Sequence, residues 1–89
     1  MSDTLIRSRP EVPYAAPTLT SRREHLTRAA AHLWRVQDSS GRTLGHLRVL
    51  SDPLGIRYRA ERLHLASGSF RLVGDFWRAD DAVAALRNG

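Results

Sequence analysis

Apolar and polar residues alternate along three successive stretches of this chain, and a turn containing glycine follows each stretch. The stretches are "LWRVQD", "TLGHLRVL" and "IRYRAE", and Gly41, Gly55 and Gly68 lie at nearly even intervals along them. A period of two residues is that of a β-strand, whose successive side chains point to opposite faces. Short turns join sequential strands into an antiparallel meander. Because "FRLVG" (70–74) supplies a further strand, we predict three or four strands.

The last segment, "FWRADDAVAALRNG", has the pattern of a helix rather than a strand. Asp80 and Asp81 fall in its first turn, where acidic groups suit the helix dipole, so we do not interpret them as a catalytic pair. Gly89 is a candidate C-cap. One apolar stripe joins Ala79, Ala82, Val83 and Leu86. The predicted fold class is therefore α+β, an antiparallel three- to four-stranded meander packed on one face by a C-terminal helix.

The first third of the chain lacks this alternation. Residues 1–20 hold three of the four prolines and no sustained apolar period, which predicts a flexible tail that is either disordered or ordered by a partner. In residues 21–32, Ser21 and Glu24 have the spacing of a capping box. The helical spacing continues at Leu26, Ala29, Ala30 and Leu33. A short helix over about residues 22–31 is predicted, with the start of a long first strand as the alternative, and residues 33–89 form the predicted domain.

The alternation places the strand residues on two faces. The face beneath the helix is expected to contain Trp34, Val36, Leu47, Val49, Ile56 and Tyr58, with Phe70 or Leu72. The opposite face collects Arg35, His46, Arg48, Arg57, Arg59 and Arg71. Glu61 is the acid expected near them. After Glu61 the phase slips, because Leu63 and Leu65 take positions that continue the arginine series, and a bulge near Arg62 or a bent strand would explain this.

The formal net charge is +5, and all 14 basic residues are arginine. A positive balance favours polyanionic partners such as nucleic acid, and guanidinium groups suit phosphates and guanine edges through paired hydrogen bonds. We therefore predict a small nucleic-acid-binding protein, with duplex DNA as the favoured ligand. Arg48, Arg57 and Arg59 would contact phosphates or bases, and Arg35, Arg71 and His46 would flank them.

Two other interpretations of this face stay open. Antiparallel sheets routinely show a polar face to water, so the arginines could be ordinary solvated surface. The protein could instead be an interaction module that docks on a host protein through its tail or the edge of its sheet. Trp34 and Trp77 are candidate stacking platforms for bases, but Trp34 is in phase with Val36 and is expected in the core. One residue of the Phe76–Trp77 pair should anchor the helix.

Motifs for chemistry are missing from the sequence. It has no cysteine, glycine-rich phosphate loop, nucleophile elbow or zinc-binding helix motif, and its four histidines do not lie at metal-ligand spacing. We therefore expect no catalytic residues, metal or cofactor, and no enzyme. A chain without cysteine is typical of the reducing cytoplasm, where we expect the protein. No run of about 18 apolar residues is present, so no membrane partner is expected.

The stretches "LWRVQDSSGRTLGHL", "YRAERL" and "GDFWRADDAVAAL" resemble a group of small uncharacterised proteins of high-GC Gram-positive bacteria and their phages. That group shares the patterns W-R-V, G-R-x-x-G-H, Y-x-A-x-R and G-x-F-W-x-x-x-D-A-V. The resemblance covers about residues 33–87 and implies no particular activity. Three strands followed by a helix also look like the DNA-binding domains of plant ethylene-response factors and the arm-binding domains of tyrosine integrases. This second likeness is architectural, and it implies that an uncovered sheet face reads a major groove.

Overall fold

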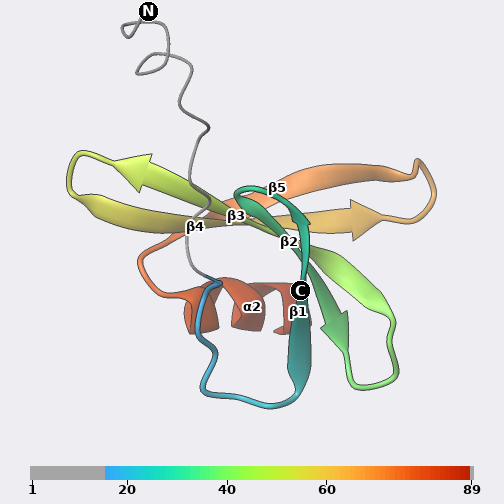
Figure 1. Cartoon of the computed structure of the whole chain (residues 1–89). Helices are drawn as coiled ribbons and strands as arrows, with labels where there is room; N and C mark the ends of the chain where they lie inside the picture. The colour runs from blue at the N-terminus through green and yellow to red at the C-terminus, as the bar shows by residue number, and fades with distance from the viewer. Residues whose placement is uncertain (1–15, 89) are drawn as a thin grey trace, which may run out of the picture.

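The computed structural model describes residues 16–88, which form one antiparallel sheet and one helix (Figure 1). The five strands pair in sequence order, each with the next along the chain. The α+β class and the meander are therefore confirmed, with five strands instead of the predicted three or four. The elements are β1 (Glu24–Ala30), β2 (Leu33–Asp38), β3 (Thr43–Asp52), β4 (Gly55–His64), β5 (Ser69–Phe76) and α2 (Ala79–Asn88).

The additional strand, β1, occupies the segment for which we predicted a helix. That prediction was wrong, and the alternative of an early strand is confirmed. Leu26 pairs with Val36, and Arg28 pairs with Trp34. Ser21 accepts a hydrogen bond from the backbone N–H of Arg23 at 3.1 Å instead of forming a capping box. An isolated helix of about ten residues is marginal in water, so pairing with β2 outweighs the local helical spacing.

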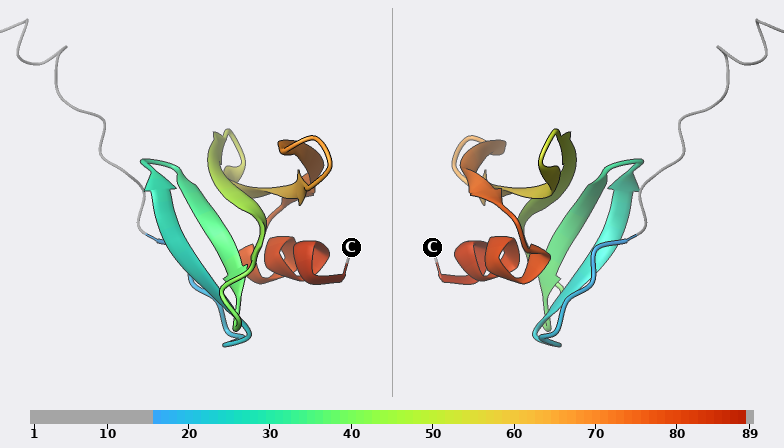
Figure 2. Two further views of the ribbon diagram at one scale, coloured as in Figure 1. Left: turned by 90° about the vertical axis from the view of Figure 1, so that its right-hand side faces the viewer. Right: turned by 90° about the vertical axis from the view of Figure 1, so that its left-hand side faces the viewer.

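The helix α2 packs on one face of the twisted sheet, against β3, β4 and β5 (Figure 2). The core between them has five sheet residues and the four residues of the predicted helix stripe. These are Trp34, Val36, Leu47, Val49, Ala60, Ala79, Ala82, Val83 and Leu86. A glycine, Gly45, lies among these residues. A side chain at this position would collide with the carbonyl oxygen of Glu61. Phe76 also packs against this core, so it is the member of the Phe76–Trp77 pair that anchors the helix.

Three residues assigned to the core by their phase lie elsewhere. Ile56, near the turn that starts β4, is 38% exposed and lies outside the core. Phe70 and Leu72 pair with Leu63 and Glu61, which places them on the face opposite α2. The placement of Phe70 and Leu72 follows from a register shift between β4 and β5.

Three bulges interrupt the strand pairing, one of them at Ala29 in β1. Leu44 is the extra residue where β3 pairs with β2, and Val73 is the extra residue where β5 pairs with β4. Both side chains pack against the core. The pairing of β3 with β4 is continuous through Arg62. The predicted bulge therefore exists, but it lies in β5 and not in β4 near Arg62.

Segments far apart in sequence are tied to the helix by polar contacts. Thr20 donates two hydrogen bonds to Asp80, from its backbone N–H and its hydroxyl, each of 2.9 Å. Leu19 packs against the core. Residues 16–20 thus belong to the fold, which corrects the predicted tail of residues 1–20 and the predicted domain start at residue 33. The first 15 residues of that tail, and the C-cap candidate Gly89, lie outside the described residues.

Two further contacts hold the C-terminal end of α2. Arg87 makes a paired contact with the carboxylate of Glu24 in β1, with N–O distances of 2.8 and 2.9 Å. Arg62, on the helix side of β4, donates to the carbonyl oxygen of Ala85 at 2.6 Å. The last carbonyls of a helix have no partner within it, so Arg62 serves as a C-terminal cap. This role explains why Arg62 departs from the arginine series of its strand.

Candidate nucleic-acid interface

The face of the sheet opposite α2, called the open face below, holds five of the six predicted site residues. Cross-strand pairs give this placement: Arg35 pairs with His46, Arg48 with Arg59, and Leu50 with Arg57. These pairs alternate with the core pairs on the other face. The grouped residues are Arg35, His46, Arg48, Arg57 and Arg59. Their grouping on neighbouring strands agrees with the sequence analysis, while binding of nucleic acid stays a prediction.

The sixth predicted residue, Arg71, does not join this group. It pairs with Arg62, whose guanidinium group reaches the end of α2. Register therefore places Arg71 on the helix side of the sheet, exposed to solvent. The cause is the bulge at Val73, which shifts the phase of β5 by one residue. Alternation within the strand cannot reveal such a shift, because the bulge depends on the pairing with β4.

Three of the four open-face arginines form ion pairs with acids. Arg59 binds Asp75 with two hydrogen bonds, of 2.7 Å from Nε and 3.0 Å from Nη2. These hydrogen bonds hold the pKa of Asp75 below its ordinary value, so the carboxylate stays charged. Weaker ion pairs join Arg48 to Glu61 at 3.3 Å and Arg57 to Asp52 at 3.6 Å.

Sequence reasoning found only one of these acids. Glu61 lies within the same strand pattern as the arginines, whereas Asp75 reaches Arg59 across β4 and β5, and Asp52 lies at the end of β3. Arg35 differs from the other three: it is exposed and forms no ion pair with any residue between 16 and 88. Arg35 and Arg48 therefore offer the most available positive charge on the open face.

His46 contributes a flat ring rather than a charge. Its imidazole stacks on the ring of Phe70, with centroids 3.8 Å apart and planes inclined by 11°. Burial lowers the pKa of His46 below its ordinary value, so the ring is neutral at pH 7. His46 thus keeps the flanking position predicted for it, where it supports an aromatic ring of β5.

A second aromatic ring lies just beyond the end of β5. The guanidinium carbon of Arg57 lies 4.6 Å from the ring centroid of Trp77, a cation–π contact. Trp77 is 51% exposed, whereas Trp34 is 2% exposed. Trp34 is thus in the core, as expected. Of the two tryptophans considered as stacking platforms, only Trp77 presents its ring to solvent.

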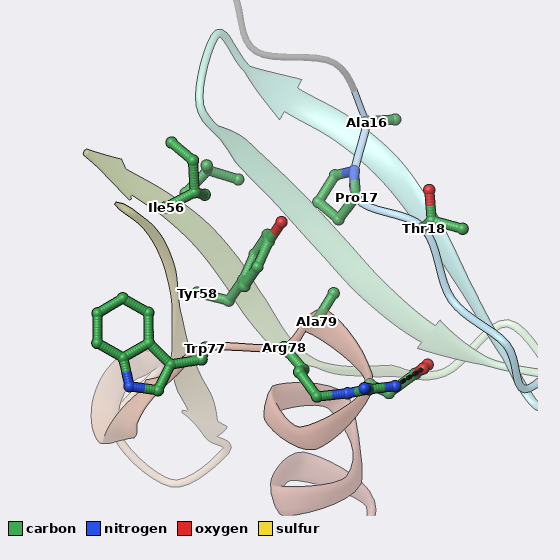
Figure 3. Close-up of a pocket in the computed structure, with 10 residues that line it drawn as sticks. Ala16, Pro17, Thr18, Ile56, Tyr58, Trp77, Arg78 and Ala79 are labelled. Carbon is green, nitrogen blue, oxygen red and sulfur yellow. Dashed lines mark ion pairs between the residues drawn. The ribbon is translucent and has the colours of Figure 1, made fainter. Parts of the chain in front are cut away.

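A hollow of about 440 Å³ lies beside Trp77, between the start of α2 and the segment that precedes β1 (Figure 3). Tyr58 points from β4 toward Pro17 across this hollow, while the indole of Trp77 is turned outward. The charged residues that line the hollow already have partners. Asp80 accepts hydrogen bonds from Thr20, and its carboxylate oxygen lies 3.8 Å from a guanidinium nitrogen of Arg78. The lining therefore offers apolar contact and no converging set of catalytic groups.

Comparisons with protein-family models, curated proteins and solved structures find no match to this chain. No helix formed by residues 16–88 has the length and apolar character needed to cross a membrane. Within the same residues, no three histidine, aspartate or glutamate side chains are grouped so that they could hold a metal ion.

Proposed function

We propose that this protein is a small nucleic-acid-binding protein, regulatory or accessory in role, and that it binds through the open face of its sheet. One observation carries the proposal: four arginines from three neighbouring strands lie together on the face of the sheet that α2 leaves uncovered. They are Arg35 on β2, Arg48 on β3, and Arg57 and Arg59 on β4. The two arginines and two acids of the first 15 residues cancel, so the whole net charge of +5 belongs to residues 16–88.

The ion pairs on this face are compatible with phosphate binding. Arg48 and Arg57 keep 42% and 32% of their side chains exposed, and each makes a single ion pair whose N–O distance is longer than 3 Å. Exposed ion pairs of this kind stabilise a protein by about 0–1 kcal/mol. A phosphate oxygen can therefore replace the carboxylate at little cost. Arg59 is held more firmly by its two bonds to Asp75, so we assign phosphate contacts first to Arg35 and Arg48, and then to Arg57.

The proposal is tested by measuring affinity for nucleic acid at increasing salt concentration. Each phosphate contact on B-DNA contributes a slope of about −0.9 in a plot of log K against log salt. Two or three contacts give a slope of roughly −2 to −3 by that rule. We expect the variant Arg35→Ser/Arg48→Ser to bind more weakly and to flatten the slope by about two contacts' worth.

The matched control removes the same charge away from the open face. Arg22 and Arg23 lie in the loop between Thr20 and Glu24, both of which bind α2. The variant Arg22→Ser/Arg23→Ser should therefore leave the slope unchanged. The proposal fails if the wild-type chain binds no duplex, single strand or RNA at about 0.1 M salt, or if both double variants weaken binding equally.

A second candidate is a protein-interaction module that docks through the outer strand β5. It is favoured by Leu72, which is 64% exposed on β5, and by exposed Leu65 in the turn that precedes β5. An apolar contact of this kind does not weaken as salt rises, unlike phosphate binding. Complexes that survive high salt, and that are lost in Leu72→Ser but retained in Arg35→Ser/Arg48→Ser, would support this candidate over the first.

A further inference from the structure

We propose that the nucleic acid held by the open face is a single strand, and that two of its bases stack on Phe70 and Trp77. This inference rests on the proposed function and adds the class of ligand. Every base has a flat face, so stacking on aromatic side chains beside a cationic surface binds single strands with little sequence preference. A duplex keeps those faces inside its own stack.

Both rings are held in place while much of their surface is open to solvent. Phe70 is supported by the stacked imidazole of His46 and is 38% exposed. Trp77 is supported by the guanidinium group of Arg57 and is 51% exposed. A ring that is already oriented loses little conformational entropy when a base stacks on it.

Neither exposed ring is needed to fill the core. Phe76, the neighbour of Trp77, packs under the helix and anchors it. The bulge at Val73 turns the Val73 side chain toward the core and leaves Phe70 on the open face. Leaving an aromatic ring in water gives up the stabilisation that burial would bring. Two such rings on the arginine face therefore form a candidate binding surface rather than a structural requirement.

The positions of the rings match a strand of nucleic acid laid along β5. Phe70 lies near the start of β5 and Trp77 follows its last residue, so the two are seven positions apart. At about 3.3 Å per residue, the rings are roughly 20 Å apart. The pairs Arg48–Arg59 and Leu50–Arg57 lie on the strands beside this line. An extended strand can thus present bases to both rings while its phosphates meet Arg48 and Arg57, two of the arginines assigned to phosphate contact.

The experiment compares a single-stranded thymidine oligomer of about ten nucleotides with a duplex of the same length. Affinity is measured by the anisotropy of labelled oligomers at one salt concentration. We expect the single strand to bind more tightly, and Phe70→Leu and Trp77→Leu each to weaken its binding roughly 5- to 150-fold while duplex binding is unchanged. Phe70→Tyr and Trp77→Phe keep a ring and should retain the affinity. Leu54→Ala, at an exposed residue of the turn between β3 and β4, is the control for loss of apolar surface.

Tryptophan fluorescence gives a readout on the unmodified protein. Trp34 is buried, so quenching by the oligomer should come from Trp77 and disappear in Trp77→Phe. If the duplex binds as tightly as the single strand, if the leucine variants keep the affinity, or if bound oligomer leaves the wild-type fluorescence unchanged, the single-strand inference is overturned while the proposed function stands. If neither oligomer binds, both are overturned.

Discussion

The two faces of the sheet each contain an arginine that grips a carboxylate with two hydrogen bonds. On the helix side, Arg87 binds Glu24 at 2.8 and 2.9 Å, and on the open face, Arg59 binds Asp75 at 2.7 and 3.0 Å. The geometry is nearly the same, but the Glu24 side chain is 3% exposed and that of Asp75 is 24% exposed. Water competes for the second pair far more than for the first.

This difference separates structural arginines from available ones. Arg87 and Arg62 are committed to β1 and to the end of α2, and removing either partner leaves a polar group without its match. Arg35 and Arg48 on the open face have no partner or a weak one among the described residues. Residue type alone therefore does not identify a binding arginine. Its partner and its exposure decide whether charge is left for a ligand.

The largest expected effect is the loss of folding when the core beneath α2 is disrupted. Val83 is buried between α2 and the sheet, so Val83→Asp places an unpaired charge in the core and should unfold the domain. Circular dichroism at rising temperature measures this. Leu54→Asp introduces the same charge at an exposed turn and should leave the melting curve almost unchanged. A folded Val83→Asp protein would contradict the packing described for α2.

The two paired contacts give the next test. Glu24→Gln leaves Arg87 without a charged partner and should lower the free energy of unfolding by about 3 kcal/mol, as expected for breaking a buried pair. Asp75→Asn breaks the same geometry on the open face and should cost less than about 1 kcal/mol. Chemical denaturation measures both. Equal losses would show that exposure does not separate the two faces.

Acid should weaken the contact between Glu24 and Arg87, because it protonates the carboxylate of Glu24. The hydrogen bonds from Arg87 hold the pKa of Glu24 below its ordinary value of 4.5. The stability from this lowered pKa is therefore present above pH 4.5 and is lost as pH falls through the folded-state pKa. Unfolding measured between neutral and acid pH should show a shallower decline for Glu24→Gln than for the wild type. Parallel declines would contradict this assignment.

A smaller effect is expected at the cap of α2. Arg62→Met keeps an apolar stem but removes the bond to the carbonyl oxygen of Ala85, and should lower stability by about 1.5 kcal/mol. For a domain of this size, that is a fall in Tm of roughly 6–12 °C. Arg71→Met, at the residue paired with Arg62, is the matched control and should change the Tm little. Equal shifts would show that Arg62 does not cap the helix.

The smallest expected effect is on the open face. Arg35→Ser/Arg48→Ser removes two half-exposed or exposed guanidinium groups and should change the free energy of unfolding by less than about 0.5 kcal/mol for each site. Thermal melting without nucleic acid measures it. A large loss of stability would show that these arginines are needed for folding, as Arg87 and Arg62 are. Their effect on binding would then have to be separated from unfolding.

Features that depend on a single segment of the chain could be predicted from the sequence. The alternation in β2, β3 and β4 placed Trp34 in the core and Arg35, Arg48, Arg57 and Arg59 on one face, as the structure has them. The failures lie where pairing overrides a local pattern. The segment of β1 has helical spacing but pairs with β2, and Arg71 has the phase of the open face until the bulge at Val73.

The sequence by itself determined the meander, the helix stripe and the division of most side chains between two faces, because periods of two and 3.6 residues are properties of a single segment. The tertiary structure alone decided that residues 24–30 form a strand and that Glu24 meets Arg87, which is 63 positions away. It also decided which acids meet the open-face arginines and that Phe70 faces the same way. These features depend on register between strands, and register is fixed by contacts between segments that are distant in the chain.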